Sequence, residues 1–192
     1  MKILSQRKGF DGDHSSVSYE FISNDISKDA KDFARESSRH FKIHDKRLKI
    51  QIFGEHYLNQ DIQDTLLEKL GIPLLIYEDY DSWNFIIMFE FDKKLMKELE
   101  NFDGVGEEDT IHVSKKGQKI ELWITVHINY GCFDESPFED LGDMFMKIRK
   151  KILEYDFESL LILKRYCNGE SKFNATSDLY KRLQSILNEN RH

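Results

Sequence analysis

The sequence predicts a single α+β domain over residues 1–192, with a mostly antiparallel sheet, a long central hairpin at about 110–130, and helices packed on one face. The segment 119–130 alternates apolar and polar residues almost without exception, as a long β-strand with one face in a core does. The segment 110–114 also alternates, and Gly117 lies between the two, where it can take the positive φ of a hairpin turn. Segments of helical period separate or follow the strands. Two prolines and short connections leave no room for a linker.

The first half of the chain predicts strand, helix, strand, helix. Residues 18–22 alternate as a strand, and apolar residues at helical spacing then predict a helix from about Lys28 to Arg39 with Ser27 as its N-cap. Residues 47–53 alternate again, which predicts a strand with Leu48, Ile50 and Ile52 inward and Arg47, Lys49 and Gln51 outward. A helix is expected over 61–70, where Gly71 and Pro73 stop it.

The second half begins with two strands at 74–77 and 83–91. The second strand is apolar on both faces from Phe85 to Phe89, so we expect it in the middle of the sheet, covered by helices on one or both sides. Asp92 is the expected cap of a short helix before the hairpin.

Three helices are expected after the hairpin. Ser136 and Pro137 match the start of a helix that runs to about Tyr155, and apolar stretches predict helices over 157–166 and around 179–187.

The composition is that of an ordinary globular protein, with 40% hydrophobic and 33% charged residues. Cys132 and Cys167 lack metal-ligand spacing and read as reduced thiols. The N-terminus lacks the apolar run of an export signal, and no apolar run is long enough to span a membrane. Glycine-rich phosphate loops and a His-Glu-x-x-His helix are absent too. We therefore expect a soluble cytoplasmic protein without a cofactor.

The negative charge is concentrated in the middle of the chain. The net charge is −7, but residues 54–146 alone carry 7 Lys/Arg against 21 Asp/Glu. An acidic surface of this kind attracts basic partners and repels nucleic acid. The alternative is a solvated acidic surface that only keeps the protein soluble.

We therefore expect a binding protein that engages a basic protein partner, as inhibitors, immunity proteins and anti-defence proteins do. The predicted contact residues lie in loops beside aromatic residues, and they are Glu78, Asp79, Asp81, Glu107, Glu108 and Asp109.

A competing hypothesis starts from the run Asp11-Gly-Asp-His-Ser-Ser16. Asp11, Asp13 and His14 are suitable ligands for a divalent metal, and His56 or His127 could complete a site for phosphodiester or nucleotide hydrolysis. His14, Asp13 and His127 would then be the catalytic residues. The alternative is a polar turn whose side chains cap backbone amides.

His112-Val-Ser114 resembles one element of the two-histidine phosphoesterases, which place two imidazoles on opposite sides of a phosphodiester. The second element does not match, because His127-Ile-Asn129 has Asn in place of a hydroxyl residue. The alternative is that both histidines are half-exposed sheet residues.

One basic run, from Arg39 to Lys49, has Phe41 and Ile43 interleaved and could grip phosphates. In an acidic protein such a run is more often a solvated connection between a helix and a strand. Nucleic-acid binding is therefore not expected.

The N-terminal pattern Asp13-His-Ser-Ser-Val-Ser-Tyr-Glu-Phe21, followed by Ser37-Ser-Arg39 and the aromatic segment 77–91, resembles an uncharacterised bacterial family with this type of start. The resemblance covers at most the first 91 residues. It implies a bacterial cytoplasmic protein and assigns no activity.

Overall fold

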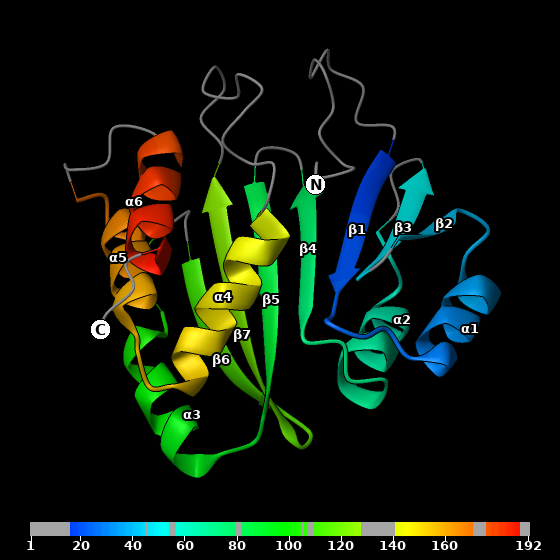
Figure 1. Ribbon diagram of the computed structural model, residues 1–192, viewed down its shortest axis with the longest axis horizontal. Coiled ribbons are helices and arrows are strands. Elements are labelled where there is room, and N and C mark those ends of the chain that lie inside the picture. Colours follow the sequence, from blue (N-terminus) through cyan, green and yellow to red (C-terminus); the bar gives the residue numbers. More distant parts are fainter. Residues whose placement is uncertain are drawn as a thin grey trace.

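The computed structural model describes residues 16–44, 46–53, 57–79, 82–104, 106, 110–127, 141–170 and 176–188. The strands in this part of the chain are β1 (Ser16–Ile22), β2 (Phe41–His44), β3 (Arg47–Phe53), β4 (Leu74–Asp79), β5 (Ser82–Glu90), β6 (Thr110–Lys116) and β7 (Lys119–His127). They form one sheet in the order β2-β3-β1-β4-β5-β7-β6, and neighbouring strands are antiparallel (Figure 1). The predicted α+β class is confirmed.

The helices are α1 (Lys28–Ser37), α2 (Gln60–Asp64), α3 (Lys93–Leu99), α4 (Leu141–Leu153), α5 (Glu158–Cys167) and α6 (Thr176–Asn188). A π-helical turn, Thr65–Lys69, continues α2, and a 3₁₀ turn, Glu100–Phe102, follows α3. Both N-caps predicted in this part of the chain are confirmed, because Ser27 accepts a hydrogen bond from the amide of Ala30 and Asp92 from that of Leu95. No helix of the described residues is long and apolar enough to cross a membrane.

The predicted hairpin is formed by β6 and β7. Lys116 pairs with Lys119, so the turn consists of Gly117 and Gln118, and Gly117 has the φ of 61° that the first position of a II′ turn requires. The hairpin is not central, however, because β6 is an edge strand and β4 is the middle strand. The physical reason is that β4 and β5 are apolar on both faces, whereas only one face of β6 is apolar.

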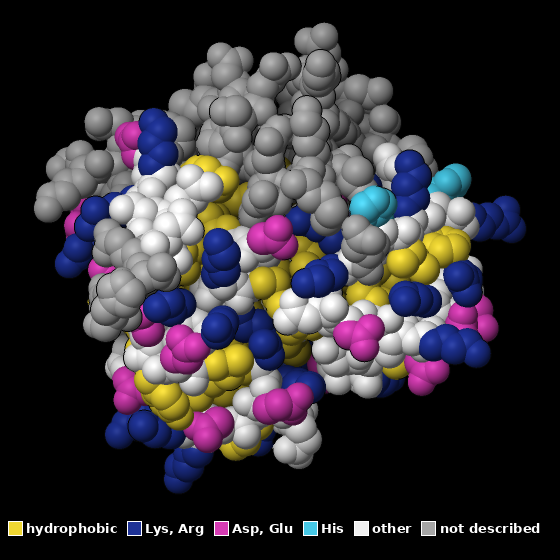
Figure 2. Space-filling view, in the orientation of Figure 1, with side chains coloured by type: hydrophobic (Ala, Val, Ile, Leu, Met, Phe, Trp, Pro, Cys, Tyr) yellow, Lys and Arg dark blue, Asp and Glu magenta, His cyan; other side chains and the backbone are white. Residues whose placement is uncertain are grey.

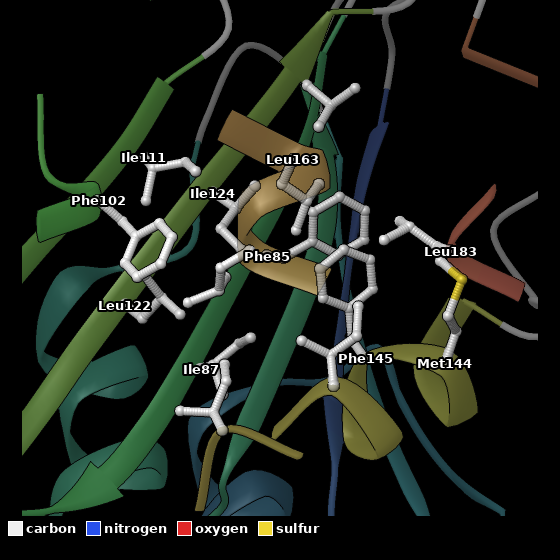
Figure 3. Packing of buried hydrophobic residues seen from close by; sticks show 14 of the residues in the cluster. Phe85, Ile87, Phe102, Ile111, Leu122, Ile124, Met144, Phe145, Leu163 and Leu183 are labelled. Atoms are coloured by element: carbon white, nitrogen blue, oxygen red, sulfur yellow. The ribbon is translucent and has the colours of Figure 1, made fainter. Parts of the chain in front are cut away.

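One face of the sheet is covered by α3, α4, α5 and α6. Alternate residues of β5 and β7, such as Phe85, Ile87, Leu122 and Ile124, pack there against residues of these helices (Figure 3). The rings of Phe85 and Phe145 stack with centroids 3.8 Å apart. This face forms the larger core.

Helices also cover the opposite face, so the prediction that helices pack on one face only is wrong. There α1, α2 and the π-helical turn pack on a second core that includes Phe21, Leu75, Ile86 and Met88. Because side chains alternate along a strand, Ile86 and Met88 point away from Phe85 and Ile87. An exposed apolar surface on this side of β4 and β5 would be unfavourable, so a second helical layer covers it.

Candidate functional site

The residues predicted to bind a basic partner lie at or beyond strand ends. Glu78 and Asp79 are the last residues of β4, and Asp81 and residues 107–109 lie outside the described residues. In the sheet, Asp79 pairs with Ser82, Ser82 pairs with His127, and β6 begins at Thr110 opposite Thr125. The end of β4 and the start of β6 are therefore at the same end of the sheet, three strand spacings apart, or about 15 Å.

The structure describes only one of the residues assigned to the metal site of the competing hypothesis. Asp11, Asp13, His14 and His56 lie outside them, while His127 ends β7 opposite Ser82. Within the described ranges, no group of three or more His, Cys, Asp or Glu side chains could hold a metal ion. The hydrolase hypothesis stays a prediction.

The two histidines of the hairpin are far apart along the strands. His112 pairs with Trp123, four residues from His127 on the same face, which corresponds to roughly 13 Å along β7. The Nδ1 atom of His112 lies 3.0 Å from Oδ1 of Asp103, and the same oxygen accepts a hydrogen bond from the Val113 amide. The described geometry therefore does not place two imidazoles on one phosphodiester, and Asp103 joins the 3₁₀ turn to β6.

The basic run 39–49 forms the edge hairpin β2–β3, not a helix-to-strand connection. Arg47 and Lys49, expected to point outward, are buried, and Gly142 of α4 packs close to the guanidinium of Arg47. The run therefore does not present all its cations to solvent.

Arg47 forms a buried ion pair that sequence periodicity did not reveal. Its Nη1 donates to Oε2 of Glu20 over 3.2 Å, and both side chains are 2–3% exposed. Oε1 of Glu20 and Nη2 of Arg47 have no hydrogen-bond partner among the described residues. Glu20 also lies directly across from Lys49, so three charged residues meet on one buried patch of the sheet. The sequence contains one signal for this ion pair: Arg47 and Lys49 alternate with apolar residues in one predicted strand, and Glu20 lies between apolar residues in another.

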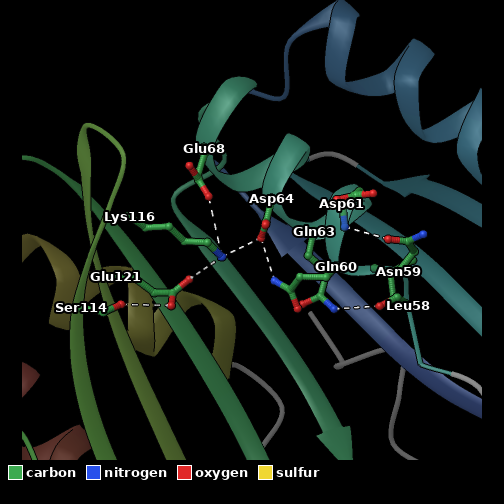
Figure 4. A network of polar contacts seen from close by, with 10 residues as sticks. All are labelled: Leu58, Asn59, Gln60, Asp61, Gln63, Asp64, Glu68, Ser114, Lys116 and Glu121. Atoms are coloured by element: carbon green, nitrogen blue, oxygen red, sulfur yellow. Dashed lines mark hydrogen bonds and ion pairs between the residues drawn. The ribbon is translucent and has the colours of Figure 1, made fainter.

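A network of charged side chains connects the hairpin to the helical layer on the opposite face (Figure 4). The ammonium of Lys116 lies 2.6 Å from Asp64, 3.4 Å from Glu121 and 3.7 Å from Glu68. Ser114 donates a longer hydrogen bond to Glu121 over 3.4 Å. The tip of the hairpin rests on the same helical turn, since a Cβ added to Gly117 would lie 3.3 Å from Oε2 of Glu68.

The charge state of Lys116 determines whether this network could take part in proton transfer. Burial by itself would lower the pKa of Lys116, but the hydrogen bond with Asp64 and the charges of Glu121 and Asp64 together raise it above the ordinary value of 10.5. A lysine whose pKa is raised above 10.5 stays protonated near neutral pH, so it cannot act as a general base there. Lys116 instead neutralises carboxylates from α2, the π-helical turn and β7, so the network is structural.

A small apolar cavity lies between the sheet and the helices of the larger core. Its volume is about 20 Å³, and its lining includes Trp83, Phe85, Leu141 and Leu183. Within the part of the chain that the structure describes, the buried Nε1 of Trp83 has no hydrogen-bond partner. A space of this size holds about one water molecule, so it is a packing gap and not a ligand pocket.

Neither a protein-family model, nor a curated protein, nor a solved structure matches the chain.

Proposed function

We propose that the protein is a cytoplasmic binding protein that engages a basic protein partner through acidic residues at the sheet end where β4 ends and β6 begins. The contact residues are Glu78, Asp79, Asp81, Glu107, Glu108 and Asp109. Its role would be that of an inhibitor, an immunity protein or an anti-defence protein, all of which act by covering a surface of their target.

The observation that carries the proposal is the separation of charge along the chain. Residues 54–146 carry 21 acidic against 7 basic residues, whereas residues 1–53 and 147–192 both have a positive balance. Charge concentrated in this way accelerates encounter with an oppositely charged surface and disfavours wrong partners.

Six of the described carboxylates of this segment are engaged by the fold, whereas Asp61, Glu98, Glu100 and Asp143 form no ion pair with the described residues. Asp64, Glu68 and Glu121 surround Lys116, Glu90 pairs with Lys119, Asp92 caps α3, and Asp103 binds His112 and Val113. These side chains are occupied by the fold. The proposed contact residues differ in that they lie together, at the end of β4 and in the connections after β4 and before β6, whose strands reach the same end of the sheet.

The test neutralises the six contact residues with isosteric amides, Glu→Gln and Asp→Asn. A matched control neutralises six exposed carboxylates elsewhere, which changes the net charge equally: Asp25, Asp29, Glu36, Asp61, Glu154 and Glu170. Wild type, variant and control are immobilised and exposed to a lysate of the native host, and each captured protein is purified and titrated by calorimetry.

We expect a basic protein that binds wild type and control with similar Kd but binds the variant at least tenfold more weakly, with the difference shrinking at high salt. A partner that binds all three proteins equally at low and high salt would refute the proposal. So would a captured partner with an acidic surface.

A further inference from the structure

The structure contains a second charged surface, of opposite sign, over α4. A shallow depression of about 630 Å³ is lined by α4, α6, the residues that follow β1, and Lys46. In the view of Figure 2, Lys and Arg side chains gather on this part of the face. The depression lies outside the sheet end proposed to bind a basic partner.

Cations dominate the lining of the depression. The charged residues of the lining are four cations, Lys46, Lys147, Arg149 and Lys150, and one carboxylate, Asp143. Lys46 and Lys147 are exposed, and neither forms an ion pair with any residue that the structure describes. Arg149 is held in place, because its Nε donates to the carbonyl oxygen of Met88 over 2.9 Å. Among the described residues, the ion pair of Lys150 is a long contact of 3.9 Å with Glu154.

Apolar side chains lie between these cations. Met144, Met146, Leu153 and Leu187 contribute to the lining, and Leu153 is 46% exposed. Methionine is flexible and polarizable, so it adapts to the side chains of a bound peptide. A surface that combines lysines with exposed apolar side chains suits a ligand that carries both carboxylates and apolar groups.

We propose that this depression binds an acidic, amphipathic peptide segment of a partner protein. Carboxylates of the segment pair with Lys46 and Lys147, and its apolar side chains contact Met146 and Leu153. A nucleic acid fits less well, because Tyr180, the aromatic residue in the lining, is buried and offers no stacking surface.

The experiment measures the binding of a fluorescent helical peptide with leucines on one face and glutamates on the other, by anisotropy at two ionic strengths. The comparison ligands are a peptide with lysine in place of glutamate, a polyglutamate peptide, and a single-stranded oligonucleotide. The double variant Lys46→Gln, Lys147→Gln tests the cations, and Leu153→Asn tests the apolar contact. Lys28→Gln, Lys97→Gln is the matched control, since these lysines are exposed on α1 and α3.

We expect wild type and control to bind the leucine-glutamate peptide equally and the Lys46, Lys147 variant to bind it roughly twofold to thirtyfold more weakly at low salt. Leu153→Asn should weaken the binding of the leucine-glutamate peptide but not the binding of polyglutamate. The proposal is wrong if no acidic peptide binds, if the lysine variant binds like the control, or if the oligonucleotide binds more tightly than the peptide. The variant lacking the six acidic contact residues should bind the peptide at least as well as wild type, so this test does not depend on the other surface.

Discussion

At the scale of single residues, the buried ion pair of Glu20 and Arg47 is the most consequential polar feature of the larger core. A buried charge is stable only with its partner, because neither charge can be solvated when the other is removed. Arg47→Met alone should therefore lower the free energy of unfolding by about 3–5 kcal/mol. Glu20→Met together with Arg47→Met should cost less than Arg47→Met alone.

Urea unfolding of wild type, both single variants and the double variant measures this coupling. Additive losses from the two single substitutions would show that the pair contributes nothing beyond the packing of its side chains.

A charge introduced on β7 should have different effects on the two faces of the strand. Ile124 is fully buried in the larger core, so Ile124→Asp should remove cooperative unfolding, because an unpaired buried charge costs several kcal/mol of a total of roughly 5–15. Thr125 is half-buried and its hydroxyl donates to Asn84 over 2.9 Å, so Thr125→Asp should cost less. Thermal unfolding followed by circular dichroism compares them. Equal damage would mean that the Thr125 face is as tightly covered as the Ile124 face.

At the scale of elements, the approach of α4 to the sheet depends on Gly142. A Cβ at this position would lie 2.5 Å from Cδ1 of Ile22 and 3.1 Å from Nη2 of Arg47. Gly→Ala in an open helix position stabilises by roughly 0.5–1 kcal/mol, but overpacking here should instead destabilise by about 1–3 kcal/mol. The sign of the change in unfolding free energy decides between the two.

Ile22→Val provides the matched test because it removes the Cδ1 atom that Gly142→Ala meets. The double variant should be more stable than the sum of the single effects predicts. A stabilised Gly142→Ala variant would show that α4 moves away from β1 without cost.

The attachment of the β6–β7 hairpin to α2 and the π-helical turn should depend on pH. The pKa of Lys116 is raised in the folded protein above its ordinary value of 10.5, so its stabilising contribution is complete below that pH and is lost as the pH rises through the folded pKa. Lys116→Met should cost about 1–3 kcal/mol at pH 7, and the variant should lose less stability than wild type in the alkaline range above pH 10.5.

Chemical denaturation at several pH values measures both effects, with the exposed Lys97→Met as control. If wild type and Lys116→Met lose stability in parallel at alkaline pH, the network does not hold the hairpin.

At the scale of the whole molecule, the strand order predicts how stability is distributed. β4 has neighbours on both sides and a helical layer on both faces, whereas β2 and β6 are the edges of the sheet that the described strands form. Amides of β4 and β5 should exchange with deuterium most slowly, and those of β2 and β6 on average faster, because local opening exposes edges first. Hydrogen exchange resolved by residue measures this order. Slower exchange in β6 than in β4 would contradict it.

The sequence by itself determined the elements that depend on local patterns. The alternation of β7, the turn at Gly117, and the caps Ser27 and Asp92 are visible in the chain because each follows from neighbouring residues. The acidic middle of the chain is also visible in the sequence, and the proposal of a basic partner rests on it.

Only the tertiary structure decided which strands are neighbours and which faces are covered. The pairing of β5 with β7 left β6 at the edge of the sheet, and Arg47 and Lys49, expected at the surface, are buried, with Gly142 of α4 close to Arg47. Lys116 meets Asp64 across 52 positions of sequence, and Lys46, which directly precedes β3, joins the cations over α4. These contacts join residues that are far apart in the sequence, so the period of a short segment does not predict them. They form because burying apolar side chains in two cores contributes more free energy than the local preferences of a short segment.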